Sequence, residues 1–219
     1  MVIQPQPPGH TPPSRWSTAQ WLWVYGQGWF PMANDPGGPL QLYRSNRRAL
    51  LPLDDRFHVP RSLRRVLNSG RFQLRLNRSF AEVLAGCAAR PSTWISDELA
   101  AIYLRLHADG LAHSVEAWDE QGLAGGLLAI GIGSCWIGES MFHHRPHASN
   151  VVLVELARAL RRGGFSLFDV QLTNPHLQRF GCYEVEDNLY QQLLISARSR
   201  PATLKLQEAC LRCEAWMPG

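Results

Sequence analysis

The chain has 219 residues, long for one small domain and short for two large ones, and its 45% apolar content is ample for one packed core. Because no apolar run reaches about 18 residues, the sequence predicts no membrane-spanning helix. The net charge of +4 is unevenly distributed: residues 1–90 hold 12 arginines and 4 acidic residues, whereas residues 91–219 hold 10 basic and 14 acidic residues. This asymmetry favours a polyanionic partner for the first half.

The N-terminal segment, residues 1–15, is rich in proline and lacks the apolar stretch of a signal peptide. We therefore expect a disordered tail on a cytoplasmic protein. The five cysteines are an odd, scattered set, which predicts reduced thiols. Cys210 and Cys213 have the spacing of a metal or redox pair, but no second pair accompanies them, so neither role is expected.

The first half predicts short elements. A helix is expected within residues 16–30, ending near Gly26, followed by a loop over 31–39 and short strands at 40–43 and 49–53. Pro60 suits the first turn of a helix over 60–67, and alternation predicts a strand over 72–76. Asn77 is then expected to cap a helix over 79–89.

Seven arginines and no acidic residue fall between residues 56 and 78. The arginine side chain is a planar fork suited to phosphate and can stack on bases. This cluster predicts a nucleic-acid-binding surface. Arginine accounts for 21 of the 22 Lys and Arg residues, however, so the base composition of the genome explains the preference equally well.

The second half is patterned more clearly. Ser96 is expected to cap a helix with Asp97 and Glu98 in its first turn and Gly110 at its end. Strands follow at 113–118, 123–132 and 134–138, then a helix over 151–162 that opens at Ser149 or Asn150, then a strand over 165–172. A strand that follows a crossover helix usually runs parallel to its neighbour. The expected fold class is α+β with a mixed β-sheet.

Two polar residues interrupt the last of these strands. On a regular strand Asp169 and Gln171 share one face, roughly 6.5–7 Å apart, so one substrate could meet both side chains. A central parallel strand is normally apolar on both faces, and such exceptions tend to mark functional sites. An edge strand with a solvated face is the alternative.

Other polar residues are weaker candidates. Glu139 is a second acid near the end of a strand, or an ordinary loop glutamate. Ser140 lacks the Gly-x-Ser-x-Gly elbow of a nucleophile. The histidines at 143, 144 and 147 have a ligand-like spacing, but Arg145-Pro146 disfavours a helix face and no Cys or acidic spacing supports zinc. We expect surface histidines and no metal site.

Several motifs in one order carry a resemblance: Gly26-Gln-Gly-Trp-Phe30-Pro31, Ser92-Thr-Trp94-Ile95, His113-Ser-Val-Glu116-Ala-Trp118, Gly125-Gly126, Gly138-Glu-Ser-Met-Phe142, Ala148-Ser149, and Asp169-Val-Gln171-Leu-Thr-Asn174-Pro-His176. Across about residues 16–195 the chain resembles leucyl/phenylalanyl-tRNA–protein transferases. The resemblance implies an N-terminal α/β subdomain over 16–72, an acetyltransferase-like (GNAT-like) catalytic domain over 73–196, and a C-terminal tail over 197–219.

The family transfers Leu or Phe, and sometimes Met, from charged tRNA to the N-terminal Arg or Lys of a protein, which marks that protein for bacterial N-end-rule degradation. The resemblance therefore implies aminoacyl-tRNA as donor, such proteins as acceptors, a monomer, and no metal or redox cofactor. The reaction is aminolysis of an ester.

The resemblance also implies roles for single residues. Asp169 and Gln171 become the catalytic pair, acting by proton relay or, as we favour because glutamine is a poor base, by orientation of the reactants. Substrate-binding roles fall to Trp94 on the adenine, Glu139 on the acceptor or the adenosine, an apolar pocket of Leu127, Trp136 and Met141, and the motif residues Ser140 and Asn174. The tRNA acceptor stem is assigned to the arginines at 61, 64, 65, 71, 75 and 78 (Arg61, Arg64, Arg65, Arg71, Arg75 and Arg78).

The chain departs from the family pattern in two places. Leu42-Tyr43 stand where members often carry Trp-Trp, and Asn150 stands where many carry Lys, which puts contacts to the adenosine and a cation near the site in doubt. Two other classes are possible from the residues alone. An acyl-CoA N-acyltransferase would need a pyrophosphate loop that residues 146–150 do not match, and a non-catalytic tRNA-binding protein would not need Asp169 and Gln171.

Overall fold

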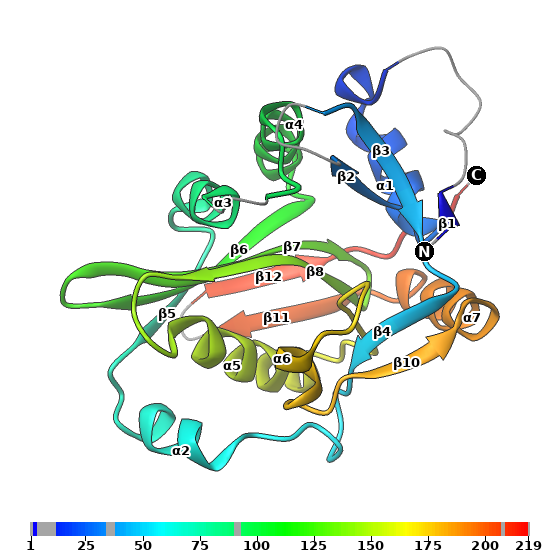
Figure 1. Ribbon diagram of the computed structural model, residues 1–219. Coiled ribbons are helices and arrows are strands. Elements are labelled where there is room, and N and C mark those ends of the chain that lie inside the picture. The colour runs from blue at the N-terminus through cyan, green and yellow to red at the C-terminus, as the bar shows by residue number, and fades with distance from the viewer. Residues whose placement is uncertain (1, 4–11, 34–37, 90–92, 207–208, 219) are drawn as a thin grey trace.

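The computed structural model describes residues 2–3, 12–33, 38–89, 93–206 and 209–218. Its centre is a seven-stranded sheet in the order β10-β4-β9-β8-β7-β6-β5 (Figure 1). The strands are β4 (Arg47–Leu51), β5 (Gln73–Leu76), β6 (Ala112–Asp119), β7 (Gly122–Ile132), β8 (Cys135–His143), β9 (Leu167–Asp169) and β10 (Tyr183–Glu186). Strands β8 and β9 are parallel and the other neighbours antiparallel. The prediction of an α+β fold with a mixed sheet is confirmed.

Two smaller sheets flank this one. The first, in the order β1-β3-β2, consists of β1 (Val2–Ile3), β2 (Phe30–Ala33) and β3 (Leu40–Arg44). The second is the hairpin of β11 (Ala202–Leu206) and β12 (Ala209–Cys213). The helices are α1 (Thr18–Gly26), α2 (Arg61–Asn68), α3 (Phe80–Ala88), α4 (Asp97–Ala108), α5 (Ala148–Arg162), α6 (Pro175–Gln178), α7 (Asp187–Arg198) and a 3-10 turn at Pro13–Arg15.

Local chemistry explains where the helices begin. Ser17 and Gln20 form a reciprocal capping box at the start of α1. The side chain of Ser96 accepts a hydrogen bond from the backbone N–H of Leu99, which confirms the expected cap of α4. Gly110 follows α4 with a φ of +76°, as expected of a residue that ends a helix.

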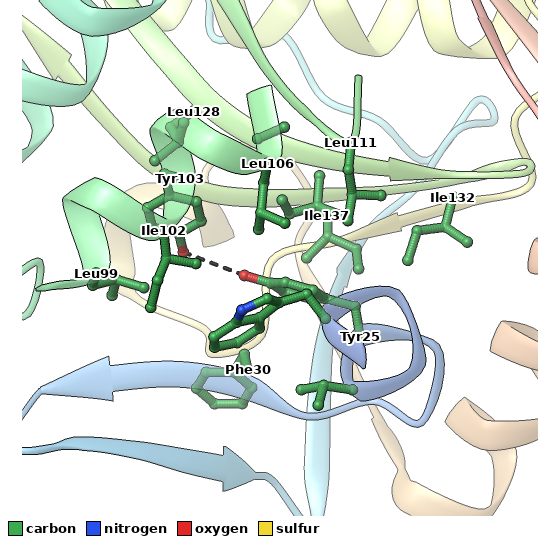
Figure 2. Close-up of a cluster of buried hydrophobic side chains, with 14 of the residues drawn as sticks. Tyr25, Phe30, Leu99, Ile102, Tyr103, Leu106, Leu111, Leu128, Ile132 and Ile137 are labelled. Atoms are coloured by element: carbon green, nitrogen blue, oxygen red, sulfur yellow. Dashed lines mark hydrogen bonds between the residues drawn. The ribbon is translucent and has the colours of Figure 1, made fainter. Parts of the chain in front are cut away.

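Two apolar cores lie on opposite faces of the large sheet. The first gathers α1, α3, α4 and the small β2–β3 ribbon, and Figure 2 shows its centre, where the Tyr25 and Tyr103 hydroxyls lie 3.4 Å apart among aliphatic side chains. The second core lies between the sheet and α5, and the β11–β12 hairpin packs there too (Figure 1). The sheet is therefore covered on both faces, which explains its many apolar strand positions.

Some expected boundaries are wrong. The loop expected over 31–39 is partly strand, since β2 pairs with β3; residues 34–37 lie outside the described residues. Asn77 does not cap α3: it has a φ of 58° and its side chain accepts a hydrogen bond from the Ser114 backbone N–H, so Ser79 precedes the helix. Helix α5 begins at Ala148, not Val151, after His147 with a φ of 71°.

The expected strand over 165–172 is also wrong in extent. Strand β9 ends at Asp169, and Gln171 has a φ of 55°, in the left-handed region that side chains rarely adopt. Asp169 and Gln171 therefore do not alternate along one strand. In contrast, β8 is longer than expected and continues through Gly138 to His143.

The proline-rich segment over residues 1–15 is expected to be disordered, and residues 197–219 are expected to form a C-terminal tail. Residues 4–11 lie outside the described residues, while Pro13–Arg15 form the 3-10 turn and residues 202–213 contain β11 and β12. Strand β4, from the expected N-terminal subdomain, belongs to the large sheet. Within the described ranges, no helix has both the length and the apolar content needed to cross a membrane.

The close packing of the C-terminal hairpin against α5 gives a stability prediction. A Cβ added at Gly163 would lie 2.1 Å from the backbone oxygen of Thr203, whereas at Gly164, with a φ of +80°, it would meet nothing within 4 Å. We expect Gly163→Ala to lower the free energy of unfolding by about 3 kcal/mol through overpacking. Gly164→Ala should cost about 1–2 kcal/mol, from backbone conformation alone. Urea denaturation compares the two, and equal costs would contradict the packing argument.

Candidate active site

A cavity of about 870 Å³ opens where β2, α3, the middle of the large sheet and the start of α5 meet. The segment that follows β9 closes one side of it. Seven residues expected from the sequence to bind substrate or act in catalysis line it: Trp94, Leu127, Glu139, Ser140, Met141, Gln171 and Asn174. The structure therefore brings together residues that are up to 80 positions apart in the chain, from Trp94 to Asn174.

A β-bulge shapes the floor of the cavity. Across the β7–β8 pair, Ser140 lies opposite Leu128 and Gly138 lies opposite Ala129, so Glu139 is an extra residue without a partner in β7. A bulge re-aims the side chain at the extra position. The Gly-Glu-Ser-Met-Phe motif is thus a distorted stretch inside strand β8, rather than a segment that follows a strand, as expected.

Glu139 is an unusual carboxylate. Its Oε1 atom is buried and has no hydrogen-bond partner among the described residues. Burial raises the pKa of Glu139 to about 8, the nearby charge of Asp169 contributes to the rise, and the Tyr25 hydroxyl and Arg48 oppose it. At neutral pH the side chain is therefore mostly protonated, and can donate as well as accept a hydrogen bond.

This pKa predicts how stability depends on pH. Because the folded protein binds the Glu139 proton more tightly than the unfolded chain does, the residue destabilises the fold progressively as pH rises from about 4.5 to about 8. We expect the free energy of unfolding of the Glu139→Gln variant to depend less on pH than that of the parent protein. Relative to the parent, the variant should therefore become more stable between pH 5 and pH 8. Urea denaturation across that range measures it, with Glu120→Gln on the exposed β6–β7 turn as the control. A pH-independent difference would contradict the prediction.

Asp169 does not line the cavity but lies behind it. It is fully buried, and both of its oxygens accept hydrogen bonds from Arg48, with the shortest, from Nη2 to Oδ2, at 2.7 Å. The Tyr190 hydroxyl also donates to Oδ2, at 2.7 Å. Arg48 in turn donates to the backbone oxygen of Gly28 and lies against the ring of Phe30. The carboxylate thus joins β4, β9, α7 and the end of the α1–β2 connection.

One further bond links this buried network to the cavity. The backbone N–H of Gln171 donates to Asp169 Oδ1 at 2.9 Å, which holds the turn that gives Gln171 its positive φ. The side chain of Gln171 lines the cavity, is only 7% exposed, and its Nε2 atom has no partner among the described residues. A buried amide donor without a partner is costly unless a ligand satisfies it.

The apolar part of the expected pocket is present only in part. Leu127 and Met141 face each other across the β7–β8 pair and both line the cavity. Trp136 does not: it is fully buried in the second core, stacked on His113 at 5.5 Å and with the edge of Phe165 against it. Trp136 therefore belongs to the second core and is not part of the cavity lining.

The two remaining expected contacts line the cavity through different elements. The backbone oxygen of Trp94 accepts a hydrogen bond from Ala33 of β2, so the residue is held against the small ribbon. The Asn174 side chain accepts a hydrogen bond from the Leu177 backbone N–H at 2.9 Å and caps α6. The departures from the family also differ in position: Asn150 lines the cavity, whereas Leu42 and Tyr43 are buried in the first core.

The six arginines assigned to tRNA are described by the structure, and none of them lines the cavity. Arg61, Arg64 and Arg65 are exposed on α2, as the apolar pattern of that helix predicts. Arg71 lies 3.8 Å from Asp119, and Arg78 packs over Trp118 at 4.5 Å. Arg75 contacts the side chain of Gln73 and its own strand.

Sequence reasoning missed the residues that support the site. Arg48 and Tyr190 form the buried network around Asp169. The available signal for this network was the position of Arg48 within the apolar strand Arg-Arg-Ala-Leu-Leu. The histidines at 143, 144 and 147 are exposed, as predicted, but they line the cavity together with His176. Among the described residues no group of His, Cys, Asp and Glu side chains could hold a metal ion.

Comparison with known proteins shows the family. A family model described as leucyl/phenylalanyl-tRNA protein transferase matches residues 50–195. A protein named leucyl/phenylalanyl-tRNA–protein transferase from Synechococcus sp. (strain JA-3-3Ab) is 54% identical over 170 residues, which cover 78% of this chain and 88% of that protein. Proteins of the same name from Synechocystis sp. (strain ATCC 27184 / PCC 6803 / Kazusa) and Akkermansia muciniphila are 53% and 46% identical, covering 79% of this chain in both cases and 87% and 91% of those proteins. The chain belongs to the leucyl/phenylalanyl-tRNA–protein transferase family and is an aminoacyltransferase.

Proposed function

We propose that this enzyme transfers Leu or Phe, and also Met, from aminoacyl-tRNA to proteins that begin with Arg or Lys, and so marks them for N-end-rule degradation. The observation that carries the proposal is the cavity that holds Gln171 and Glu139 beside the apolar pair Leu127 and Met141. It offers polar groups for an ester and an amine next to a surface for an apolar side chain.

The chemistry requires no redox step. The acceptor's α-amine attacks the ester carbonyl carbon, the bond from that carbon to the ribose oxygen breaks, and the amine proton passes to the departing oxygen. A peptide bond replaces the ester. Positioning the two reactants and stabilising the developing oxyanion can supply much of the rate increase.

Gln171 is the residue that we assign to these tasks. Its unpartnered Nε2 can donate to the ester oxygen while Oε1 accepts from the amine. Asp169 has a different part in the proposal: its oxygens are occupied by Arg48, Tyr190 and the Gln171 backbone, so it acts by holding Gln171 in place. Orientation is therefore favoured over a proton relay through Asp169.

The remaining contacts follow from position. Leu127 and Met141 are proposed to receive the side chain of the donor amino acid, which excludes polar and β-branched residues by desolvation and size. Trp94 is proposed to pack against the terminal adenine. Glu139 is proposed to hold the acceptor, because a cation entering the cavity would favour the ionised form of this carboxyl.

We also propose four properties of the whole chain. They are the acetyltransferase-like fold of residues 73–196, the subdomain of residues 16–72, a monomeric state and a cytoplasmic location. The parallel pairing of β8 with β9 after the α5 crossover supports the first of them.

The direct test of the function is transfer of labelled leucine from charged tRNA to a reporter protein that begins with Arg. The same reporter beginning with Ala is the control. We expect label on the Arg reporter alone. Equal labelling of both would refute the acceptor rule, and no labelling of reporters beginning with Arg or Lys would refute the proposed reaction.

The arginines on α2 give a prediction about tRNA binding. Reversing the charge at Arg64 and Arg65 should weaken tRNA binding and reduce the slope of log K against log salt by about 0.9 for each phosphate that the variant no longer neutralises. Titrations at several salt concentrations measure the slope. Arg212→Glu, on the C-terminal hairpin, serves as the control. An unchanged slope in the α2 variants would argue against this surface.

A further inference from the structure

Two histidines from separate elements line the cavity. His143 is the last residue of β8, and His176 lies on α6; both line the cavity. Burial lowers the pKa of His176, and the neighbouring Arg179 and His143 contribute to the lowering. His143 Nδ1 also lies 3.4 Å from the Ser149 hydroxyl in the first turn of α5.

Of the other charged groups near His143 and His176, Arg145 already has partners and Glu139 has a different proposed role. Arg145 follows His143 by two positions, but its guanidinium is held by Asp119 at 2.7 Å and by the backbone oxygen of Gly122 at 2.8 Å. Glu139 also lines the cavity, at the bulge of β8. Arg179 is exposed just beyond α6. This part of the cavity lining therefore combines four histidines, at 143, 144, 147 and 176, with the positive end of the α5 dipole.

A second observation indicates that this cavity holds a ligand. Gln171 is only 7% exposed, lines the same cavity, and has an amide donor without a partner among the described residues. A donor ester placed at Gln171 would have the 5′-phosphate of its terminal adenosine one ribose away. Imidazole N–H groups beside a helix N-terminus suit such an anion.

We propose that His143 and His176, with the first turn of α5, bind the phosphate on the 5′ side of the terminal adenosine of the donor. This inference rests on the proposed function and adds a contact that fixes the ester relative to Gln171. The contact is made by neutral or protonated imidazoles as donors, and is strongest when they are protonated.

The test uses two small donors that differ only in that phosphate: 3′-O-phenylalanyl-adenosine and 3′-O-phenylalanyl-adenosine 5′-monophosphate. Transfer to a peptide beginning with Arg gives kcat/KM for each, and their ratio measures recognition of the phosphate within one protein. We expect the intact enzyme to favour the monophosphate about tenfold, which corresponds to one charge-assisted hydrogen bond. In the double variant His143→Gln, His176→Gln the ratio should fall towards one.

His58→Gln is the control, because His58 is exposed on the segment before α2 and does not line the cavity. It should keep the ratio of the intact enzyme. A ratio near one in the intact enzyme, or a full ratio in the double variant, would overturn the proposal while leaving the proposed function in place. If the enzyme transferred the amino acid neither from the two small donors nor from charged tRNA, both this proposal and the proposed function would be refuted.

Discussion

Asp169→Ala is expected to lower the free energy of unfolding by about 3–5 kcal/mol, because it leaves the Arg48 guanidinium buried without its counter-ion. Arg48 is 1% exposed and Asp169 is fully buried, so solvent cannot compensate. The substitution also removes the acceptor for the Tyr190 hydroxyl and for the Gln171 backbone N–H. Urea denaturation at neutral pH measures the loss.

A double variant separates stability from positioning. Replacing both charges by apolar residues, Arg48→Met with Asp169→Leu, removes the unpaired ion and should recover most of the lost stability. Transfer should nevertheless stay low, because Gln171 still lacks the hydrogen bond that holds its backbone. If the double variant regained both stability and full transfer, Asp169 would have no positioning role.

Gln171→Ala is expected to lower kcat by about 100- to 1,000-fold, the usual effect of removing a preorganised hydrogen-bond donor from a reaction centre. Both residues carry a Cβ, so the cost of the positive φ is the same in each. Single-turnover transfer from charged tRNA measures the chemical step.

The affinity for tRNA distinguishes a lost catalytic group from a lost site. Since phosphate contacts dominate that affinity, the Kd of the Gln171→Ala variant should be almost unchanged. Gln178→Ala, on the exposed face of α6, is the matched control and should transfer normally. Normal turnover in Gln171→Ala would remove this residue from the mechanism.

The sequence predicted the elements whose signals are local. The cap at Ser96, the stop at Gly110 and the exposed arginines of α2 depend on contacts within one or two turns, and the structure confirms each. The mixed sheet was also predicted, because alternating apolar strands and an intervening helix restrict the topology to few arrangements.

Features that depend on distant partners were not predicted. Asp169 was expected beside Gln171 in contact with substrate, but Arg48, 121 positions earlier, turns it into a buried anchor. Strand β9 ends early, at Asp169, and a bulge makes Glu139 the extra residue of β8. Both features arise from the pairing of strands in the sheet, and no periodic pattern in the local sequence predicts them. Trp136 was misplaced for the same reason, because the register of β8 against β7 decides which residues reach the cavity.

The most direct test of the whole account is a crystal structure with a stable donor analogue, adenosine carrying leucine through a 3′-amide bond. The account predicts that the amide carbonyl lies at Gln171, the leucine side chain between Leu127 and Met141, and the adenine near Trp94. An analogue bound outside this cavity, or bound in it with its carbonyl away from Gln171, would contradict the account.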